Sequence, residues 1–399
     1  MEKISNFGIF TLLFVSSLTI MVGTVIAPSL SGIVEHKNLG FSASWLITLP
    51  SLGVVLFAPL VGRLLNKLGT IKLLSLGLVP YAILGFIGAF ITNDYLLILD
   101  RILLGAATVA IQVSVTAYIA DFFTGEARMK MIAWQGMSIE LGGVVFLAIG
   151  GILGEINWQL PFYIYLLAIL CLFLVAKTLP RKEHKIVDKT TSPVTDKKSK
   201  SKVKLIFLAS LLAMMLFFIG FVTLPLYLPN SFDFNESETG YSMAFISVIA
   251  IITASQMPKM VKKLGDGKTV TLGFIFFMLG YLVLATTMSI PFLVLSLIFI
   301  GIGFGFTIPL LNHMMVEVSN AQNQGKNLGL FSMGVFGGQF LSTFIEYVSD
   351  NYTAIYGVAG TLALIIGAYI YFMFRKLSRL QFLLLRFTTI VDESKKLEK

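Results

Sequence analysis

The sequence of 399 residues is poor in charge and has a single cysteine. Only 13% of the residues are charged, which is about half the share found in an ordinary soluble domain. Because Cys171 is alone, a disulfide framework, a thiolate metal cluster and a paired redox site are excluded. No Ser/His/Asp set and no metal-spaced cluster stands out either. The sequence therefore predicts a protein that is not an enzyme and needs no metal or cofactor.

Apolar residues are what the sequence has in excess. They make up 56% of the chain, against about 45–50% in a soluble domain, and the mean hydropathy is +0.86. A helix needs about 20 mostly apolar residues to cross about 30 Å of hydrocarbon. Twelve runs meet that rule: residues 7–33, 43–65, 72–92, 95–119, 131–153, 160–179, 205–229, 238–258, 268–288, 291–316, 327–349 and 354–375. The alternating pattern of a membrane barrel is absent, so the sequence predicts an all-α polytopic membrane protein.

The basic residues lie on one side of this layout. Of the 30 Lys and Arg, only Lys37 falls in a loop on the opposite side and only Arg101 lies well inside a span, which leaves 28 on one side. Because basic residues collect on the cytoplasmic side, we expect a protein of the cell membrane with both termini in the cytoplasm. The net charge of +9 then describes one membrane face and indicates no nucleic-acid partner.

Two segments lie outside the spans. Residues 181–204 are basic and polar without apolar periodicity, which predicts a cytoplasmic linker between a first six-helix bundle, 1–180, and a second, 205–376. The last stretch, 377–399, has an apolar side opposite basic residues but is too short to span. We expect a cytoplasmic amphipathic tail that lies along the membrane surface.

The two halves of the chain repeat each other at a constant offset of 196 residues. Lys-Leu-Gly at 67–69 recurs at 263–265, in the loops that follow the second and the eighth span. The same offset pairs Lys72 with Lys268, Gly105 with Gly301, Asp121 with Glu317 and Gly142 with Gly338. Two six-helix repeats with a substrate site between them near the midplane are a known transporter architecture.

Several short motifs along the chain match one family. The first is Gly-x-Leu-x-Asp-Arg-x-Gly followed by basic residues, matched by Gly62, Leu64, Lys67, Gly69 and Lys72, with Asn66 where the acid is expected. The others are Leu97, Arg101 and Gly105 on the fourth span, Asp121 and Arg128 after it, and Trp158 and Phe162 at the start of the sixth. The sequence resembles the major facilitator superfamily and, within it, the twelve-helix drug:proton antiporters.

This resemblance implies the major facilitator fold and a gate on the cytoplasmic side. The gate charges are expected to pair across helix ends when the cavity faces outward and to separate when it opens inward. The residues that the resemblance assigns to the gate are Gly62, Asn66, Lys67, Gly69, Lys72, Asp121, Arg128 and Gly265. Since Asn66 cannot be an anion, we expect a weaker latch unless another acid substitutes.

Two antiporter features are missing. The helix 5 pattern Gly-x-x-x-Gly-Pro-x-x-Gly-Gly reads here as Gly142, Phe146, Leu147, Gly150 and Gly151, without the central Gly-Pro. The first span also lacks the acidic residue that several multidrug members use. These departures concern the type of transport and leave the predicted fold unchanged.

A few ionisable residues lie inside the spans. Each costs about 2.5–3.5 kcal/mol or more in a membrane, so each one retained indicates a function or a partner. The four are Asp100, Arg101, Glu140 and Glu346. One face of the fourth span carries Arg101, Gly105, Thr108 and Gln112, and we expect it to line the central cavity. Our hypothesis is that Arg101 holds Asp100 or Glu140 ionised until a proton releases it; the alternative is that Arg101 only pins its helix to a neighbour.

Other polar side chains extend the candidate site. Gln135 and Ser138 lie on the fifth span, Asn312 and His313 near the inner end of the tenth, and Ser332, Gln339, Ser342 and Glu346 form a polar stripe on the eleventh. The candidates for proton coupling are Arg101, Asp100, Glu140, Glu346 and His313. The candidates for substrate binding are Arg101, Thr108, Gln112, Gln135, Ser138, Asn312 and Gln339. His313 titrates in a useful range and has Glu317 four residues on, but two ligands do not make a metal site.

Taken together, these features predict a secondary transporter that works by alternating access. We expect a monomer in the lipid bilayer that exports a small organic molecule in exchange for protons. Two alternatives remain open. One is the export of a specific anionic metabolite such as a siderophore, with Arg101 holding its carboxylate. The other is a transport-inactive receptor or a lipid-binding scaffold.

Overall fold

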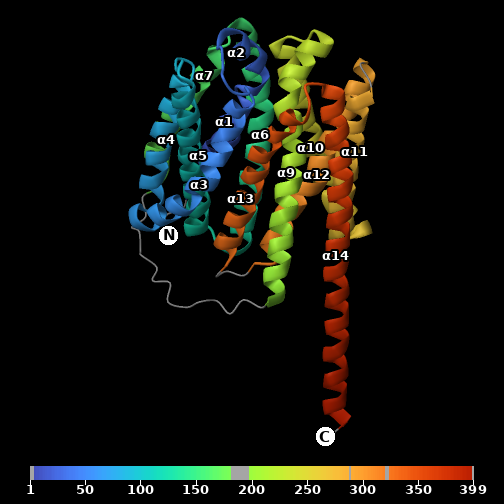
Figure 1. The fold of residues 1–399 in the computed structure, drawn as a ribbon. Coiled ribbons are helices and arrows are strands. Elements are labelled where there is room, and N and C mark those ends of the chain that lie inside the picture. The colour runs from blue at the N-terminus through green and yellow to red at the C-terminus, as the bar shows by residue number, and fades with distance from the viewer. Residues whose placement is uncertain (1–3, 181–196, 287–288, 320–322, 398–399) are drawn as a thin grey trace.

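The computed structural model describes residues 4–180, 197–286, 289–319 and 323–397, and these form a bundle of long helices (Figure 1). Twelve helical segments in this part of the chain are long and apolar enough to cross a membrane, which confirms the twelve predicted spans. The helices are α1 (Asn6–Thr24), η1 (Ala27–Ser29), α2 (Leu30–His36), α3 (Trp45–Leu68), α4 (Thr70–Ile87), α5 (Asp94–Phe122), α6 (Gly125–Ile156), α7 (Leu160–Tyr163), η2 (Ile164–Leu166), α8 (Leu167–Thr178), α9 (Lys197–Phe232), α10 (Glu236–Leu264), α11 (Asp266–Thr286), α12 (Ile290–Glu317), α13 (Gln324–Ser342), η3 (Thr343–Val348) and α14 (Tyr352–Leu397).

The bundle has two distinct ends. The turns that join α3 to α4 and α10 to α11 lie at one end, and the exposed side chains of Lys67, Lys72, Lys262 and Lys263 surround them. We call this the basic end. The opposite end, where α2 and α7 lie, is the far end. The N and C labels in Figure 1 both lie toward the basic end.

The two turns at the basic end have the same backbone conformation. Gly69 ends α3 with φ 78° and ψ 169°, and Gly265 ends α10 with φ 79° and ψ 163°. This region of φ is open to glycine and strained for other residues. The predicted repeat is therefore present in the backbone as well as in the sequence.

Close helix contacts also recur at the offset of 196 residues. Gly105 of α5 lies against the carbonyl group of Pro50 in α3, and Gly301 of α12 lies in the same way against the carbonyl group of Ile246 in α10. Added side chains at these glycines would overlap the facing backbone. Small residues let helix backbones approach one another in a membrane, where water provides no apolar driving force. Both halves thus use the same contact to join their second and fourth spans.

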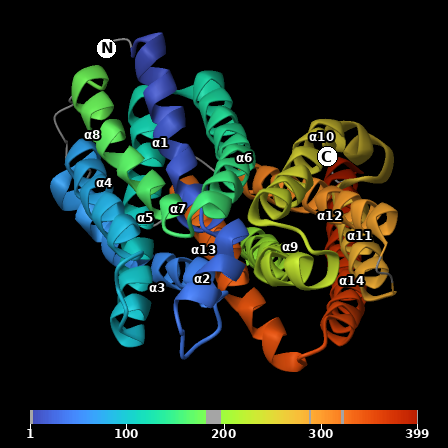
Figure 2. The ribbon, with the colours of Figure 1, turned by 90° about the horizontal axis from the view of Figure 1, so that it is seen from above.

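Two helix pairs join the first six spans to the last six. α6 packs along α10, and α13 packs along α3. Viewed from above, the earlier helices occupy one side, the later helices the other, and α13 reaches between them (Figure 2). The surfaces of α3, α6, α10 and α13 therefore control how the halves meet.

Two predicted segments need correction or lie outside the described residues. Residues 181–196 of the predicted linker are not described, and Lys197–Lys204, its last part, are helical and form the first turns of α9. The helix extends because its basic residues continue an uninterrupted helical run into the apolar span. The tail after residue 377 continues α14 as a helix to Leu397 (Figure 1), and its position relative to the membrane surface stays a prediction. No glycine or proline interrupts the chain there to turn it.

Candidate functional site

Arg101 and Asp100 form a buried ion pair on α5. The guanidinium donates from Nε and Nη2 to Oδ2 of Asp100, at 2.9 and 2.7 Å. Arg101 is fully buried and Asp100 is 4% exposed. Of the two carboxylates that the hypothesis allowed for Arg101, the structure selects Asp100. Charge-assisted hydrogen bonds of this kind compensate part of the cost of burying both groups.

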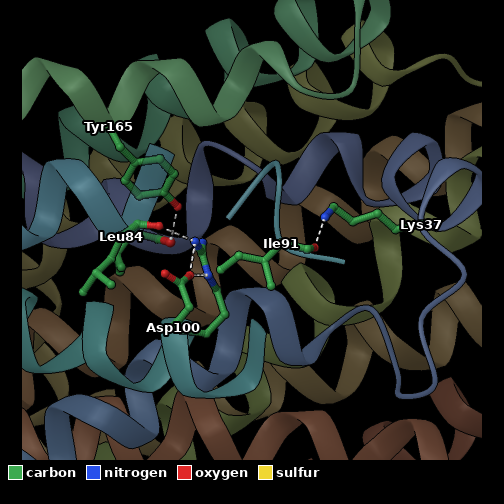
Figure 3. A network of polar contacts seen from close by, with 7 residues as sticks. Lys37, Leu84, Ile91, Asp100 and Tyr165 are labelled. Carbon is green, nitrogen blue, oxygen red and sulfur yellow. Dashed lines mark hydrogen bonds and ion pairs between the residues drawn. The ribbon is translucent and has the colours of Figure 1, made fainter. Parts of the chain in front are cut away.

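The rest of the surroundings of Arg101 also belong to the first half of the chain. Nη2 donates a second hydrogen bond to the carbonyl oxygen of Leu84 at 2.9 Å, and the guanidinium lies 5.7 Å from the ring centre of Phe162 and 5.9 Å from that of Tyr165. Figure 3 shows Asp100, Leu84 and Tyr165 close to one another. Arg101 therefore ties α5 to the end of α4 and to the α7–η2 segment.

Three members of the face that is predicted to line the central cavity, Arg101, Gly105 and Thr108, are buried in this structure. Arg101 is enclosed by its own half, and Thr108 is fully buried with its hydroxyl bonded to the carbonyl of Leu104. A shared helix face shows which residues point the same way, but the neighbouring helices decide what that face meets. Gln112, further toward the basic end, remains partly exposed.

Lys37 lies beside this cluster in the loop between α2 and α3. Its Nζ donates to the carbonyl oxygen of Ile91, and it lies 5.5 Å from the ring centre of Trp158 (Figure 3). Burial lowers the pKa of Lys37, the positive charge of Arg101 lowers it further, and Asp100 opposes both effects. The one basic residue that the sequence placed on the far side thus joins three segments at the far end.

A ladder of hydrogen bonds connects α3 to α13 and η3 at the far end. Ser51 donates to Gln339 at 2.7 Å, and the hydroxyls of Thr48 and Thr343 are bonded to each other. Beyond them, Glu346 accepts from both Ser42 and Ser44. These pairs follow one another along two antiparallel helices, so they close the far end between the halves.

The predicted polar stripe on the eleventh span was correct in part. Gln339 and Glu346 face the other half, but Ser342 bonds to the carbonyl of Gln339 within its own helix. Thr343, the next residue, makes the contact with α3 that was expected of Ser342. The hydroxyls of Ser44, directly before α3, and of Thr48 and Ser51 on it were missed; their spacings of four and three residues could have indicated a matching stripe.

The second connection between the halves, α6 against α10, depends on small residues. Gly240 of α10 lies so close to Gly151 and to the carbonyl of Leu147 that neither glycine has room for a side chain. Glu140 lies seven residues before Leu147, and this spacing puts the two on one face of α6. Glu140 is partly exposed, and no ion pair to it occurs among the described residues.

Several predicted polar residues lie in the half of the bundle nearer the basic end. The amide of Gln135 in α6 donates to the hydroxyl of Thr116 in α5 at 3.2 Å, and Ser138 donates to the carbonyl of Leu13 in α1 at 2.9 Å. Asn312 of α12 is partly exposed and is the equivalent of Thr116 at the offset of 196 residues. Thr116 was missed, although it follows Gln112 by four residues and could have been found by that spacing.

Open space surrounds the helices at the basic end. No described heavy atom lies within 4 Å of where a side chain would begin at Gly62, Gly125, Gly136, Gly265, Gly325 and Gly329 near this end, and the same is true of Gly357 in α14. The contrast with the close contacts of Gly151 and Gly240 at the far end is clear. The hydrogen bonds between α3 and α13 and the contact of Gly151 with Gly240 hold the described parts of the two halves together at the far end.

The predicted gate residues lie at this open end. Asn66, Lys67, Lys72 and Asp121 are exposed, and Arg128 is partly buried. Gly69 and Gly265 make the tight turns described above. The pairing of the gate charges stays a prediction.

His313 lies near the same end of α12. Its Nδ1 is 3.7 Å from Oε1 of Glu317, and both side chains are about half exposed. Among the described residues no group of three or more potential ligands could hold a metal ion.

The chain is similar to known membrane transporters over most of its length. The sequence matches the model of the Major Facilitator Superfamily over residues 12–343. The chain belongs to this superfamily. It is 27% identical to the tetracycline resistance protein, class B, of Escherichia coli over 78% of this chain and 79% of that protein. It is 23% identical to multidrug resistance protein 2 of Bacillus subtilis (strain 168) over 82% of this chain and 84% of that protein.

Solved structures show the same fold. A peptide transporter crystallised with alafosfalin has a TM-score of 0.76 at 17% identity, with 94% of this chain and 95% of that chain covered. The protein is thus a multi-pass membrane transporter of the major facilitator superfamily that handles small molecules, and it is not an enzyme.

Proposed function

We propose that this major facilitator protein exports a small organic molecule from the cytoplasm in exchange for protons. The basic end is its cytoplasmic face, since 28 of its 30 Lys and Arg fall on that side. Both termini are then cytoplasmic. The two groups of six spans rock against each other as a monomer, with residues 181–196 connecting them.

The observation that carries this proposal is the unequal contact between the halves. The hydrogen-bond ladder between α3 and α13 and the contact of Gly151 with Gly240 close the far end, while Gly62, Gly136 and Gly329 face open space toward the basic end. A transporter that opens to one side at a time requires this asymmetry. On this proposal, the form described here is the inward-facing one.

Polar side chains on the open side form the proposed substrate site. Gln112, Thr116 and Gln135 come from the first half, and Asn312 comes from the second. They come from helices of both halves, so a bound molecule would contact both and follow their movement. The chain also has 34 Phe and 16 Met, and those that border this site would give such a molecule an adaptable apolar surface.

Glu140 is the proposed proton carrier. It lies on the face of α6 that packs against α10, is partly exposed, and has no cationic partner among the described residues. A carboxylate at a moving contact between halves can accept a proton in one state and release it in the other. Arg101 is fully buried and its charge is paired with Asp100, so it is unsuited to hold an anionic substrate and export of an anionic metabolite is the less favoured alternative.

Proteoliposomes with a pH-sensitive dye inside test the proposal. The probes are tetracycline, a quinolone and a lipophilic fluorescent cation, since named relatives are tetracycline, quinolone and multidrug resistance proteins. At least one probe should move protons in wild type and none in Glu140→Gln. Glu155→Gln is the matched control, because Glu155 is exposed near the far end of the same helix. Proton movement that survives in Glu140→Gln would exclude Glu140 as the proton carrier. Binding of a probe without transport of any probe would favour a transport-inactive receptor.

A further inference from the structure

We propose that Glu346, Ser42 and Ser44 form a proton-released clasp that holds the far end closed. The clasp is closed while the carboxylate is ionised and opens when the carboxylate is protonated. This gating acts at the far end and does not depend on which substrate is carried or on proton exchange at Glu140.

The first support is the geometry across the two halves. Ser44 donates to Oε2 of Glu346 at 2.7 Å, and Ser42 donates to the same oxygen. The two hydroxyls are also 2.9 Å apart, so the three groups form one closed cluster. Residues 42 and 44 precede α3, whereas Glu346 belongs to η3, more than 300 positions away in the chain. When the halves separate at the far end, these bonds must break.

The second support is the charge balance around the carboxylate. Glu346 forms no ion pair with a lysine, arginine or histidine in the described part of the chain. Tyr352 of α14 is the titratable group that interacts with it, and α9 and α13, which also pack against this turn, place no charge that acts on it. Its negative charge is therefore balanced by hydroxyl donors alone. Without a cation to hold the proton off, the ionisation state of this carboxylate follows the pH of the solution that reaches it.

The third support is the different strength of the two protonation states. Hydrogen bonds to a carboxylate are roughly twice as strong as those to a neutral acid. A proton on Oε2 of Glu346 also takes up one of the lone pairs that accept hydrogen bonds from the two serine hydroxyls. The closed far end is thus favoured above the pKa of Glu346 and loses that advantage as the pH falls through it.

The position of the clasp allows the outer solution to control it. Glu346 and Ser42 are partly exposed, while Ser44 is fully buried. The neighbouring pairs, Thr48 with Thr343 and Ser51 with Gln339, are neutral and do not titrate in the physiological range. Of the four contacts in the ladder, only the clasp can respond to protons.

Distances between spin labels at the far end test the clasp. Labels on cysteines at Tyr95 of α5 and Phe292 of α12, both exposed, report the separation of the halves, in a Cys171→Ala background that removes the native thiol. The protein is placed in lipid nanodiscs and measured from pH 8 to pH 5 in sodium-free buffer. In wild type the ratio of open to closed far ends should rise about tenfold, which corresponds to about 1.4 kcal/mol.

Three variants separate the clasp from a general loss of structure. In Glu346→Gln the far end should be open more often at pH 8, and the ratio of open to closed far ends should not change with pH. In Glu346→Asp this ratio should still change with pH. Ser51→Ala is the matched control: it removes a neutral rung of the ladder, so it should change the ratio while the pH response is retained. The proposal is overturned if Glu346→Gln responds to pH like wild type, or if the wild-type distance does not change with pH in the absence of sodium. Neither outcome bears on proton exchange at Glu140.

Discussion

The guanidinium of Arg101 binds the carboxylate of Asp100, the residue directly before it in the chain, and both are buried. Neighbours in a helix point about 100° apart, so a pair of this kind forms only where the long arginine side chain folds back along its own helix. The pair then presents one neutral unit to α4 and η2. This arrangement indicates a structural task for the helix 4 arginine of this chain.

Removing Arg101 should destabilise the protein. In Arg101→Ala, Asp100 is left buried without its partner, and loss of one member of a buried pair costs about 3–5 kcal/mol. We expect a large drop in the thermal unfolding midpoint in detergent, measured by tryptophan fluorescence.

The double variant provides the control. Asp100→Asn combined with Arg101→Met removes both charges and should recover much of the lost stability. If Arg101→Ala keeps the wild-type midpoint and loses transport instead, Arg101 acts in transport and the structural interpretation is wrong.

The close approach of α3 and α5 makes Gly105 sensitive to substitution. A side chain in Gly105→Ala would overlap the carbonyl group of Pro50, and overpacking of this kind costs about 1–3 kcal/mol. Gly357→Ala in α14 is the matched control, since open space surrounds that position. The unfolding midpoint should fall in the first variant and stay or rise in the second. Equal unfolding midpoints in the two variants would show that α3 and α5 can move apart without a loss of stability.

Lys37 should make stability depend on alkaline pH. Because burial and Arg101 lower its pKa in the folded protein, the unfolded chain holds this proton more tightly than the folded one. The free energy of unfolding therefore rises as the pH increases from the folded pKa to the ordinary value of lysine. Lys37→Met should remove this rise, as measured by midpoints between pH 7 and pH 10.5 relative to wild type. If the unfolding midpoint of Lys37→Met rises with pH by the same amount, the pH dependence belongs to another group.

The polar residues of the open side should contribute to substrate affinity. Thr116→Val and Asn312→Ala should each raise KM about 2- to 10-fold with little change in the unfolding midpoint, because each removes one hydrogen bond worth about 0.5–1.5 kcal/mol. The measurement is initial transport rate in proteoliposomes against substrate concentration. Thr361→Val is the control, since Thr361 is exposed on α14 and bonds to its own backbone. An equal rise in KM in this control would argue against a specific site.

Sequence periodicity was sufficient for the spans and for the turns. The spans are long apolar runs, and the lipid solvent demands that each be a helix, so length and composition decide them. Gly69 and Gly265 were predictable because the repeated Lys-Leu-Gly marks the same turn twice. The end of α14 was harder to predict, since an amphipathic sequence does not determine the direction of its axis.

The environment of each polar side chain could not be read from spacing alone. Arg101 and Gln112 lie on one helix face, yet the first is enclosed by Leu84, Phe162 and Tyr165 while the second is partly exposed. Which neighbour covers which turn of α5 depends on helix crossings, and these follow from contacts such as that of Gly105 with Pro50. Gln339 was identified as polar and inward-facing, but its partner Ser51 lies 288 positions away, beyond the reach of any local pattern.

The ladder between α3 and α13 is built mainly from hydroxyl and amide groups. Counterions largely screen the attraction between exposed charged groups that are more than about 10 Å apart at 0.1 M salt, but they have little effect on hydrogen bonds between neutral groups at contact distance. The neutral rungs should hold equally well in fresh water and in brine. A transporter closed in this way can face surroundings of very different salinity without leaking.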